Sequence, residues 1–393
     1  MKSKREIESE IIDLLIQKGS VTRPYLNEYF DIRPATLLEI IDRLKEVGVI
    51  VEPERKGRKT GRKASPVCLN ADYGYIAGID FQTDTTSGIV IDMEKQVKAC
   101  FETVPKAFKD FRVGKEEILK VIESLKKQLG SSWSKVKGIG FTDPGIVDIE
   151  RGVCIKAVNI QGWTNVAIKK WITEETGLDC IVYPSNMARA YIEYHNTFPN
   201  YPKSLFYIEL DVGIGGGFIK NGSLFIGDTF CGMEIGHIVV DSNGPLCQCG
   251  NKGCLEAIAG KAGIAKKINE LIANGVQTEL RNENFSIPSF VKCVKNNDKV
   301  ACALANEISN KIGIGLVSAI ALLNPSMIVF GGELSKLDEF LLSTVKRTIS
   351  MHCFPDAIKN LQLKISKLDC YAESMGAALI MRKKILEDSI HSD

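Results

Sequence analysis

A histidine and three cysteines in one short segment constrain the fold of this chain more than any other feature. The segment contains Glu234-Ile235-Gly236-His237 and then Cys247-Gln248-Cys249-Gly250-Asn251-Lys252-Gly253-Cys254-Leu255-Glu256. Three thiolates and one imidazole complete the tetrahedral ligand set of Zn²⁺ and leave no coordination position open for a reacting water. The spacing therefore predicts a structural zinc ion, not a hydrolytic one, with these ligands: His237, Cys247, Cys249 and Cys254. The alternative, a cluster of free thiols, gives no reason for the turn glycines at 250 and 253.

The other cysteines are scattered singly along the chain and are expected to behave as small buried hydrophobic residues. The N-terminal segment is charged from its start, and no apolar run approaches the roughly 20 residues that a membrane helix needs. We therefore expect a cytoplasmic protein with no membrane partner. A reducing compartment also argues against a disulfide framework.

Residues 1–66 are predicted to form a winged helix-turn-helix DNA-binding domain. Apolar positions at helical spacing predict a helix over 6–18, a short helix over 22–29 and a third helix from Arg33 to Val47. Gly19 and Gly48 are typical helix stops, and a short strand, Val49–Val51, follows the third helix. In such a domain the third helix enters the major groove of double-stranded operator DNA. Its candidate DNA contacts are Arg33, Thr36 and Arg43.

The loop after this strand is basic, although the net charge of the whole chain is only +2. A loop of this kind can reach DNA phosphates or an adjacent minor groove. The alternative is a solvated linker that happens to be basic. Its place directly after three helices favours DNA. The cations concerned are Arg55, Lys56, Arg58, Lys59, Arg62 and Lys63.

The rest of the chain is predicted to form two α/β lobes, 72–184 and 185–371. Strands over 75–81, 87–92 and 97–104, a helix over 113–129 and a strand over 136–141 form one set. The same β-β-β-α-β order recurs from residue 203 onward, which predicts two similar lobes with a cleft between them. A last helix, about 372–385, is expected to return to the first lobe and complete it.

The zinc segment, with Glu-x-Gly-His followed by Cys-x-Cys-Gly-x-x-Gly-Cys-Leu-Glu, resembles the signature of the ROK family of repressors, open reading frames and sugar kinases. The resemblance covers about residues 72–385. It implies an actin-like (ribonuclease-H-like) two-lobed fold, and the N-terminal domain resembles the repressor branch of the family. Repressors of the family act as dimers or higher oligomers, which implies a homodimer or homotetramer with its contact surface on the second lobe.

The resemblance also implies a sugar site. Asn159 lies in Asn159-Ile160-Gln161-Gly162-Trp163, which is similar to the family's sugar-contacting Asn-x-x-Gly-Trp loop. Glu234, His237 and Glu256 match positions that contact sugar hydroxyls, so His237 would bind zinc through one ring nitrogen and face the sugar with the other. Carboxylates suit vicinal hydroxyls because each one accepts two hydrogen bonds. The alternative for the two glutamates is to orient the zinc loop.

Three departures from the family's kinases decide the predicted activity. Asn186 stands where the kinases have their catalytic aspartate, and a carboxamide cannot remove a proton from the sugar hydroxyl, although it can still bind the sugar. The kinases' Asp-x-Gly-Gly-Thr phosphate loop is replaced by Asp80-Phe81-Gln82-Thr83-Asp84, and Val212 replaces a threonine in the second phosphate loop. ATP binding and phosphoryl transfer are therefore not expected. Asp143 is a conceivable replacement base, but a cap on the Pro-Gly turn is the simpler interpretation.

The sequence thus predicts a regulator of carbohydrate-utilisation genes, a repressor controlled by a sugar in a catalytically inactive kinase-like cleft. Two alternatives stay open at this stage. One is an active sugar kinase with a fused DNA-binding domain. The other is a regulator controlled by a sugar phosphate or a protein partner.

Overall fold

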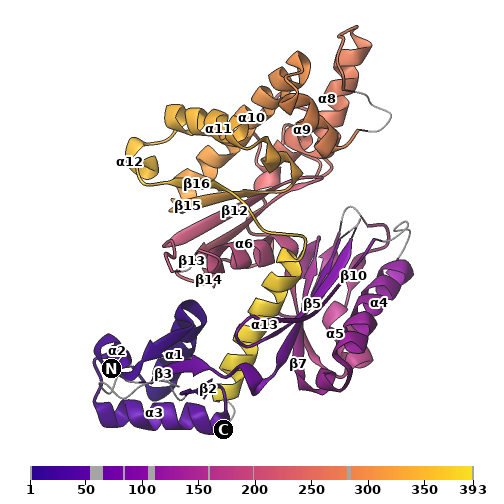
Figure 1. The fold of residues 1–393 in the computed structure, drawn as a ribbon. Coiled ribbons are helices and arrows are strands. Elements are labelled where there is room, and N and C mark those ends of the chain that lie inside the picture. The colour runs from indigo at the N-terminus through magenta and orange to yellow at the C-terminus, as the bar shows by residue number, and fades with distance from the viewer. Residues whose placement is uncertain are drawn as a thin grey trace. The chain divides into compact units, whose positions relative to one another are not determined.

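The computed structural model describes residues 2–53, 65–82, 85–104, 111–157, 160–197, 199–280 and 285–391. The chain forms two compact units, shown in Figure 1. Unit 1 combines Met1–Tyr201 with Asp369–Asp393, and unit 2 comprises Pro202–Leu368. Unit 2 is therefore inserted into the chain of unit 1. No helix within the described ranges is long and apolar enough to cross a membrane.

The N-terminal part of unit 1, which we call the head, has three helices and a small antiparallel sheet with strand order β1-β3-β2. Ser3 and Glu6 form a capping box at the start of α1, and Gly48, with φ of +86°, ends α3. The helices share a buried apolar core that includes Ile11, Leu26 and Ile41. The elements are α1 (Lys4–Lys18), β1 (Ser20–Thr22), α2 (Arg23–Phe30), α3 (Pro34–Val47), β2 (Ile50–Val51) and β3 (Pro66–Leu69).

The remainder of unit 1 is built on a five-stranded sheet with strand order β11-β7-β4-β5-β6, in which β4, β7 and β11 are parallel. Its strands are β4 (Tyr75–Phe81), β5 (Thr86–Asp92), β6 (Val97–Thr103), β7 (Val136–Asp143) and β11 (Asp179–Pro184). The main helices are α4 (Phe111–Leu129), α5 (Ile168–Thr176), α6 (Ser185–His195) and α13 (Ala372–His391). A small sheet is formed by β8 (Ile146–Asp148), β9 (Val153–Lys156) and β10 (Thr164–Val166).

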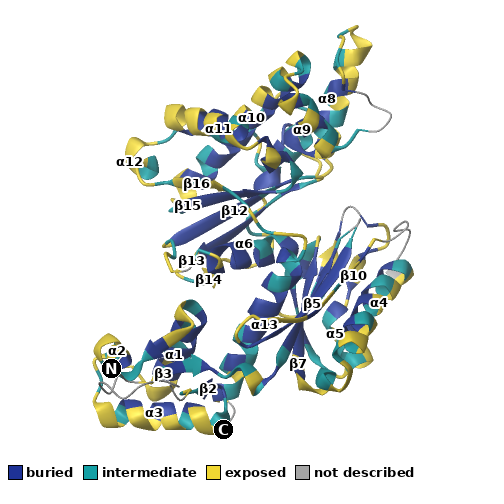
Figure 2. Ribbon diagram, viewed as in Figure 1, coloured by how far each residue is buried: buried dark blue, intermediate teal, exposed yellow. Residues whose placement is uncertain are grey.

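Helix α13 lies directly on the centre of this sheet because glycines face it. A Cβ atom at Gly78 of β4 would lie 1.8 Å from the carbonyl oxygen of Ser374, and one at Gly140 of β7 would lie 2.1 Å from that of Ala377. The helix is dark blue along much of its length in Figure 2, which marks it as buried. The last described helix of the chain is thus part of the core of unit 1.

Unit 2 repeats this arrangement with a second five-stranded sheet, of strand order β14-β13-β12-β15-β16. The two sheets pair their strands in the same way. In unit 1, β6, β5 and β4 are antiparallel neighbours, and β7 and β11 continue parallel to β4. In unit 2, β14, β13 and β12 are antiparallel neighbours, and β15 and β16 continue parallel to β12. The strands are β12 (Ser204–Leu210), β13 (Ile214–Lys220), β14 (Ser223–Leu224), β15 (Met327–Gly331) and β16 (Gln362–Ile365). Its helices are α7 (Leu255–Ala259), α8 (Lys261–Ala273), α9 (Ile287–Lys295), α10 (Lys299–Leu323), α11 (Glu339–His352) and α12 (Pro355–Ile358).

The division between the units differs from the predicted boundary at residue 185. Helix α6 belongs to unit 1 because it packs on α13 at very short range. A Cβ atom at Gly376 would lie 2.3 Å from the carbonyl oxygen of Ala188, and Arg189 forms an ion pair with Glu373 at 2.7 Å. These contacts join residues far apart in the chain, so spacing along the sequence could not reveal them.

Candidate functional site

The four predicted metal ligands come together in unit 2. Their ligand atoms, on His237, Cys247, Cys249 and Cys254, all lie within 4.8 Å of one another. The Sγ atoms of Cys249 and Cys254 are 3.6 Å apart, and Nδ1 of His237 is 3.7 Å from Sγ of Cys247. A tetrahedral zinc site, with Zn–S near 2.3 Å, requires S–S separations of about 3.8 Å. The cluster can therefore hold a metal ion, and its donor set fits Zn²⁺.

The loop that carries the cysteines is shaped by glycines and by backbone pairing. Gly250 and Gly253 have φ of +96° and +71°, a region that other residues rarely adopt. A Cβ atom at Gly253 would lie 1.5 Å from the carbonyl oxygen of Asp241. Asp241 in turn is held by Lys311 of α10 at 2.8 Å. The cysteine loop is thus held against the helical layer of unit 2 by contacts of the chain itself.

His237 presents its two ring nitrogens to different partners. Nδ1 faces Cys247, as stated above, while Nε2 lies 4.0 Å from a carboxylate oxygen of Glu234. Burial raises the pKa of Glu234 above its ordinary value. One imidazole can therefore bind a metal on one side and, together with Glu234, face a ligand on the other.

Glu256, at the start of α7, is engaged with the glycine-rich turn that leads into β13. One of its carboxylate oxygens accepts a hydrogen bond of 2.8 Å from the backbone N–H of Ile214. This bond leaves the other oxygen as a potential acceptor for a ligand hydroxyl. Glu256 therefore holds the turn before β13 in place, in addition to its predicted contact with a ligand.

The same turn carries an acidic residue, Asp211, next to Val212, the residue that replaces a threonine of the kinases. Asp211 precedes Val212, and its carboxylate accepts hydrogen bonds of 2.8 and 2.9 Å from the backbone N–H groups of Val212 and Glu333. In phosphate-binding loops, backbone N–H groups point at the anion. Here one N–H of the turn, that of Val212, is bound by a carboxylate of the chain itself, and the same carboxylate binds the N–H of Glu333 after β15.

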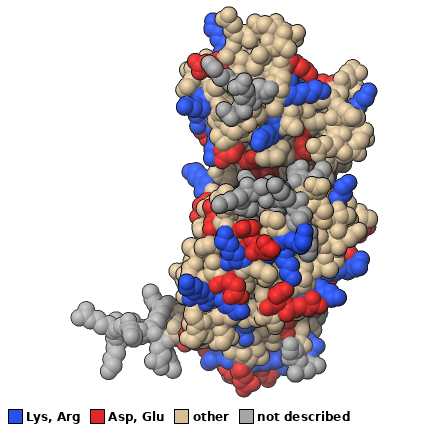
Figure 3. Space-filling view, turned by 90° about the vertical axis from the view of Figure 1, so that its right-hand side faces the viewer, with Lys and Arg blue, Asp and Glu red and all other residues tan. Residues whose placement is uncertain are grey.

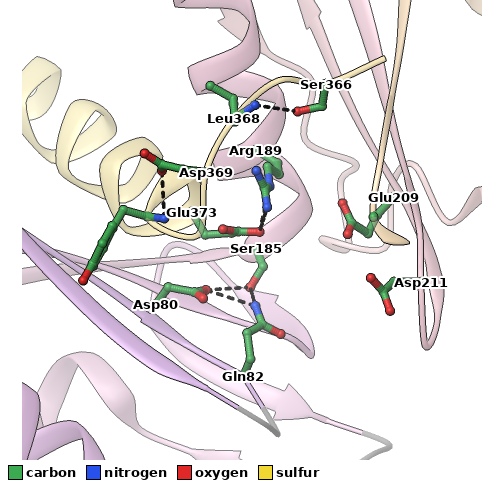
Figure 4. A network of polar contacts seen from close by, with 12 residues as sticks. Asp80, Gln82, Ser185, Arg189, Glu209, Asp211, Ser366, Leu368, Asp369 and Glu373 are labelled. Atoms are coloured by element: carbon green, nitrogen blue, oxygen red, sulfur yellow. Dashed lines mark hydrogen bonds and ion pairs between the residues drawn. The ribbon is translucent and has the colours of Figure 1, made fainter. Parts of the chain in front are cut away.

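In unit 1, Asp80 and Gln82 of the predicted first phosphate loop form a polar network with Ser185, drawn in Figure 4, while Thr83 and Asp84 lie outside the described residues. The buried carboxylate of Asp80 accepts hydrogen bonds from Thr142 at 2.6 Å and from the Gln82 side-chain amide at 3.0 Å. The same amide donates to the hydroxyl of Ser185 at 2.8 Å. Burial, and then the charge of Glu373, raise the pKa of Asp80 to about 7. The Gln82 side chain, at the position where the family's kinases are expected to have glycine, is thus held between Asp80 and Ser185.

The ion pair between Arg189 and Glu373 was not anticipated from the sequence. Both side chains are 15% exposed, and Arg189 lies one turn after the half-buried Asn186 on α6. The family motif, with alanine at the position of Arg189, was the only available signal. Asn159 lies outside the described residues, so its predicted contact with a sugar stays a prediction.

Asp143 is bound on both sides and is not free to act as a base. One carboxylate oxygen accepts from Nε1 of Trp163 at 2.7 Å, and the other accepts from the N–H of Gly145 at 2.8 Å. The residue is fully buried, and burial raises its pKa. Its geometry is that of the turn cap that the sequence suggested.

The candidate DNA contacts in the head have different surroundings. Arg33 is exposed and Thr36 is half-buried at the start of α3. Arg43 is partly exposed, with 37% of its side chain accessible, and its guanidinium donates to the buried carboxylate of Glu8 at 2.8 Å and to the carbonyl of Ile390 at 3.1 Å. These partners would compete with DNA for the guanidinium, so the DNA contact of Arg43 stays a prediction. The basic loop, Arg55 to Lys63, lies outside the described residues.

The face of the molecule drawn in Figure 3 shows no region in which basic side chains predominate. Blue and red side chains are interspersed there among uncharged ones. This distribution agrees with the net charge of +2. With so small a net charge, strong attraction to an anionic surface such as DNA would need a local cluster of cations, and the face in Figure 3 shows none.

The chain resembles known proteins along nearly its whole length. It is 27% identical to the xylose repressor of Caldicellulosiruptor bescii over 388 residues, covering 96% of this chain and 95% of that protein. It is 25% identical to the DNA-binding transcriptional dual regulator NagC of Escherichia coli over 375 residues, covering 95% and 91%. The crystal structure of a ROK family transcriptional regulator, a homolog of the E. coli MLC protein, matches with a TM-score of 0.83 and 23% identity, covering 98% and 97%.

The structural match covers the head and both units, so the arrangement of elements described above is that of a known fold. The twin five-stranded sheets are those of the actin-like, sugar-kinase-like body that the sequence predicted. The ROK family itself matches over residues 76–384, which is most of the chain. From this match, the chain belongs to the ROK family.

Proposed function

We propose that this protein is a sugar-responsive transcriptional repressor whose kinase-like body binds its effector without phosphorylating it. The observation that carries the proposal is the similarity to the xylose repressor across 96% of this chain and 95% of that protein, head included. The similarity to NagC, which also spans the head, supports it. The first is named a repressor and the second a DNA-binding transcriptional regulator.

The head is, in this proposal, a winged helix-turn-helix. Support comes from its three helices, from the antiparallel pairing of β2 with β3, and from the long connection between these strands. That connection, which contains the basic loop, would be the wing. We propose that α3 enters the major groove with Arg33 and Thr36 near its start, and that the wing contacts phosphates or the minor groove.

The effector is proposed to be a sugar or amino sugar, and its proposed contacts are Asn159, Asn186, Glu234, His237 and Glu256. The two-sided environment of His237 supports this assignment. A structural Zn²⁺ bound by His237, Cys247, Cys249 and Cys254 would fix the orientation of that imidazole. Zinc would supply rigidity and no chemistry, because its coordination shell would be complete.

Phosphoryl transfer is not part of the proposed function. Asn186 offers no base, Gln82 stands in the first phosphate loop, and Asp211 binds the Val212 amide of the second loop and the Glu333 amide after β15. A kinase needs both the base and the phosphate contacts. Control by a sugar phosphate or by a protein partner is the main competing proposal, and a homodimer or homotetramer remains the expected assembly.

The test is fluorescence anisotropy with the purified full chain and labelled DNA from upstream of its own gene. Titrations at fixed salt are repeated with D-xylose, D-glucose, N-acetyl-D-glucosamine and their phosphates. We expect one free sugar to shift the operator affinity by about tenfold, a typical allosteric coupling. A response only to a sugar phosphate would show that the effector is a sugar phosphate and not a free sugar. A lack of specific DNA binding would contradict the proposal as a whole.

A further inference from the structure

Helix α13 reaches from the candidate ligand residues of unit 1 to the head. It has 20 residues, which corresponds to a length of about 30 Å. Its first turn carries Glu373, beside α6, and its last turn carries Ser389 and Ile390, beside the head. A single helix is therefore in contact with both of the regions whose states a regulator has to connect.

At the ligand end, α13 is joined to α6 by charge and by close packing. Arg189 donates to Glu373 at 2.7 Å, with both side chains largely shielded from water. Gly376 lies against the backbone of Ala188, where a Cβ atom would overlap the carbonyl oxygen. Asn186, the proposed sugar contact, is one turn before Arg189 on the same helix. A displacement of this turn cannot leave α13 unaffected.

At the head end, polar contacts join α13 to three separate segments. Lys383 forms an ion pair with Asp13 of α1 at 2.8 Å. The hydroxyl of Ser389 is 2.5 Å from that of Tyr73, just after β3, and the carbonyl of Ile390 accepts from Arg43 of α3. The contact with Arg43 lies on the helix that is proposed to read DNA. The position of α3 is thereby tied to the end of α13.

A second connection runs in parallel through α6. The hydroxyl of Tyr201, beyond the end of α6, donates to the carbonyl of Gln17 at the end of α1 at 3.0 Å. The ring of Tyr201 lies 5.1 Å from that of Tyr194 on α6. Of the two helices that meet at the Arg189–Glu373 pair, α13 contacts the head directly and α6 is connected to it through Tyr201.

We propose that the α6–α13 pair is the mechanical link through which ligand occupancy at Asn186 changes the position of α3 in the head. The Arg189–Glu373 pair is the ligand-side contact of this link, and the contacts of Ser389 and Ile390 are its head-side contacts. The proposal rests on the proposed function for the effector and the DNA. The link itself is a property of unit 1 and can be tested without either.

The experiment is hydrogen–deuterium exchange of the full chain, read by mass spectrometry. Glu373→Gln removes the ion pair at the ligand end, and exchange is read in α1 and α3 of the head. Ser389→Ala removes a hydrogen bond at the head end, and exchange is read in residues 187–191 of α6. Because coupling is reciprocal, each change should accelerate exchange at the opposite end, by about twofold to tenfold for one lost hydrogen bond.

Lys384→Met is the matched control. Lys384 lies on α13 between the two ends, but its ion pairs are with Asp179 and Asp388, both outside the head and α6. We expect this substitution to leave exchange in α1, α3 and residues 187–191 within twofold of the unmodified chain.

Effects confined to the end that carries the substitution would overturn the link. So would an equal effect of Lys384→Met, because it would show general loosening of α13. If Glu373→Gln does not fold, exchange in residues 187–191 of the Ser389→Ala variant tests the link by itself. A failure of DNA binding or of the sugar response would instead contradict the proposed function, since no DNA or sugar is present in this experiment.

Discussion

Gly250 and Gly253 share a left-handed backbone conformation but differ in their surroundings. A Cβ atom at Gly250 would meet nothing within 4 Å, whereas one at Gly253 would overlap the carbonyl oxygen of Asp241. The conformational cost of a side chain is about 1–2 kcal/mol at either position. Only Gly253 adds a steric conflict, and this conflict lies at the base of the cysteine loop.

We therefore predict that Gly253→Ala lowers zinc content and stability together, by more than about 2 kcal/mol, while Gly250→Ala costs about 1 kcal/mol and keeps its zinc. Metal content by mass spectrometry and thermal unfolding in parallel check this. Equal zinc occupancy in the two variants would mean that the contact with Asp241 does not shape the metal site.

Asp80 provides a prediction for the pH dependence of stability. Burial, and then the charge of Glu373, raise its pKa to about 7 in the folded chain, against about 4 for an ordinary aspartate. Between these values the folded state binds more protons than the unfolded state, so this group's contribution to stability is lost as the pH rises. Asp80→Asn carries no such proton and keeps an acceptor for Thr142.

The unfolding temperature of Asp80→Asn, relative to the unmodified chain, should accordingly increase by several degrees from pH 4 to pH 8. Thermal unfolding at one-unit intervals of pH measures the difference. A difference that is constant with pH would show that Asp80 stays charged throughout the range.

At the scale of elements, helix α6 and the two phosphate loops determine whether the kinase-like body can use ATP. We predict that Asn186→Asp does not restore sugar-dependent ATP turnover, because Gln82 and Asp211 still occupy the two phosphate loops. An assay of ADP release with D-xylose, D-glucose and N-acetyl-D-glucosamine tests this. Sugar-dependent ADP release by the single variant would refute the account of both loops.

The elements with strong periodicity were predictable from the sequence. The helix expected over 113–129 is α4, Phe111–Leu129, and the strand expected over 75–81 is β4. The metal cluster was predictable because its cysteines are adjacent in the chain and its spacing is specific. Local pattern was sufficient in each case.

Contacts between distant residues were not predictable in the same way. Arg189 and Glu373 are 184 residues apart, and Arg43 and Ile390 are 347 apart. The contact of Arg43 with Ile390 could not be foreseen, because helical spacing alone does not show which face of α3 meets α13. The same limit placed α6 in the wrong unit, since its packing on Gly376 depends on tertiary structure.

At the scale of the whole molecule, the net charge of +2 makes DNA binding depend on few cations. We predict that replacing Lys56, Arg58 and Lys59 by alanine reduces the slope of log K against log salt by up to about three, since each phosphate contact contributes about 0.9. Anisotropy titrations between about 50 and 200 mM salt measure this slope, because phosphate contacts change DNA affinity strongly over that range. An unchanged slope would show that the loop does not contact phosphates.

The insertion of unit 2 into unit 1 has a consequence for how the protein is made. On the ribosome the head is synthesised first, but α13, which Arg43, Asp13 and Tyr73 contact, follows only after the whole of unit 2. Domains generally fold in the order of synthesis. The nascent head therefore emerges without these contacts and gains them only after unit 2 has been synthesised, when α13 docks.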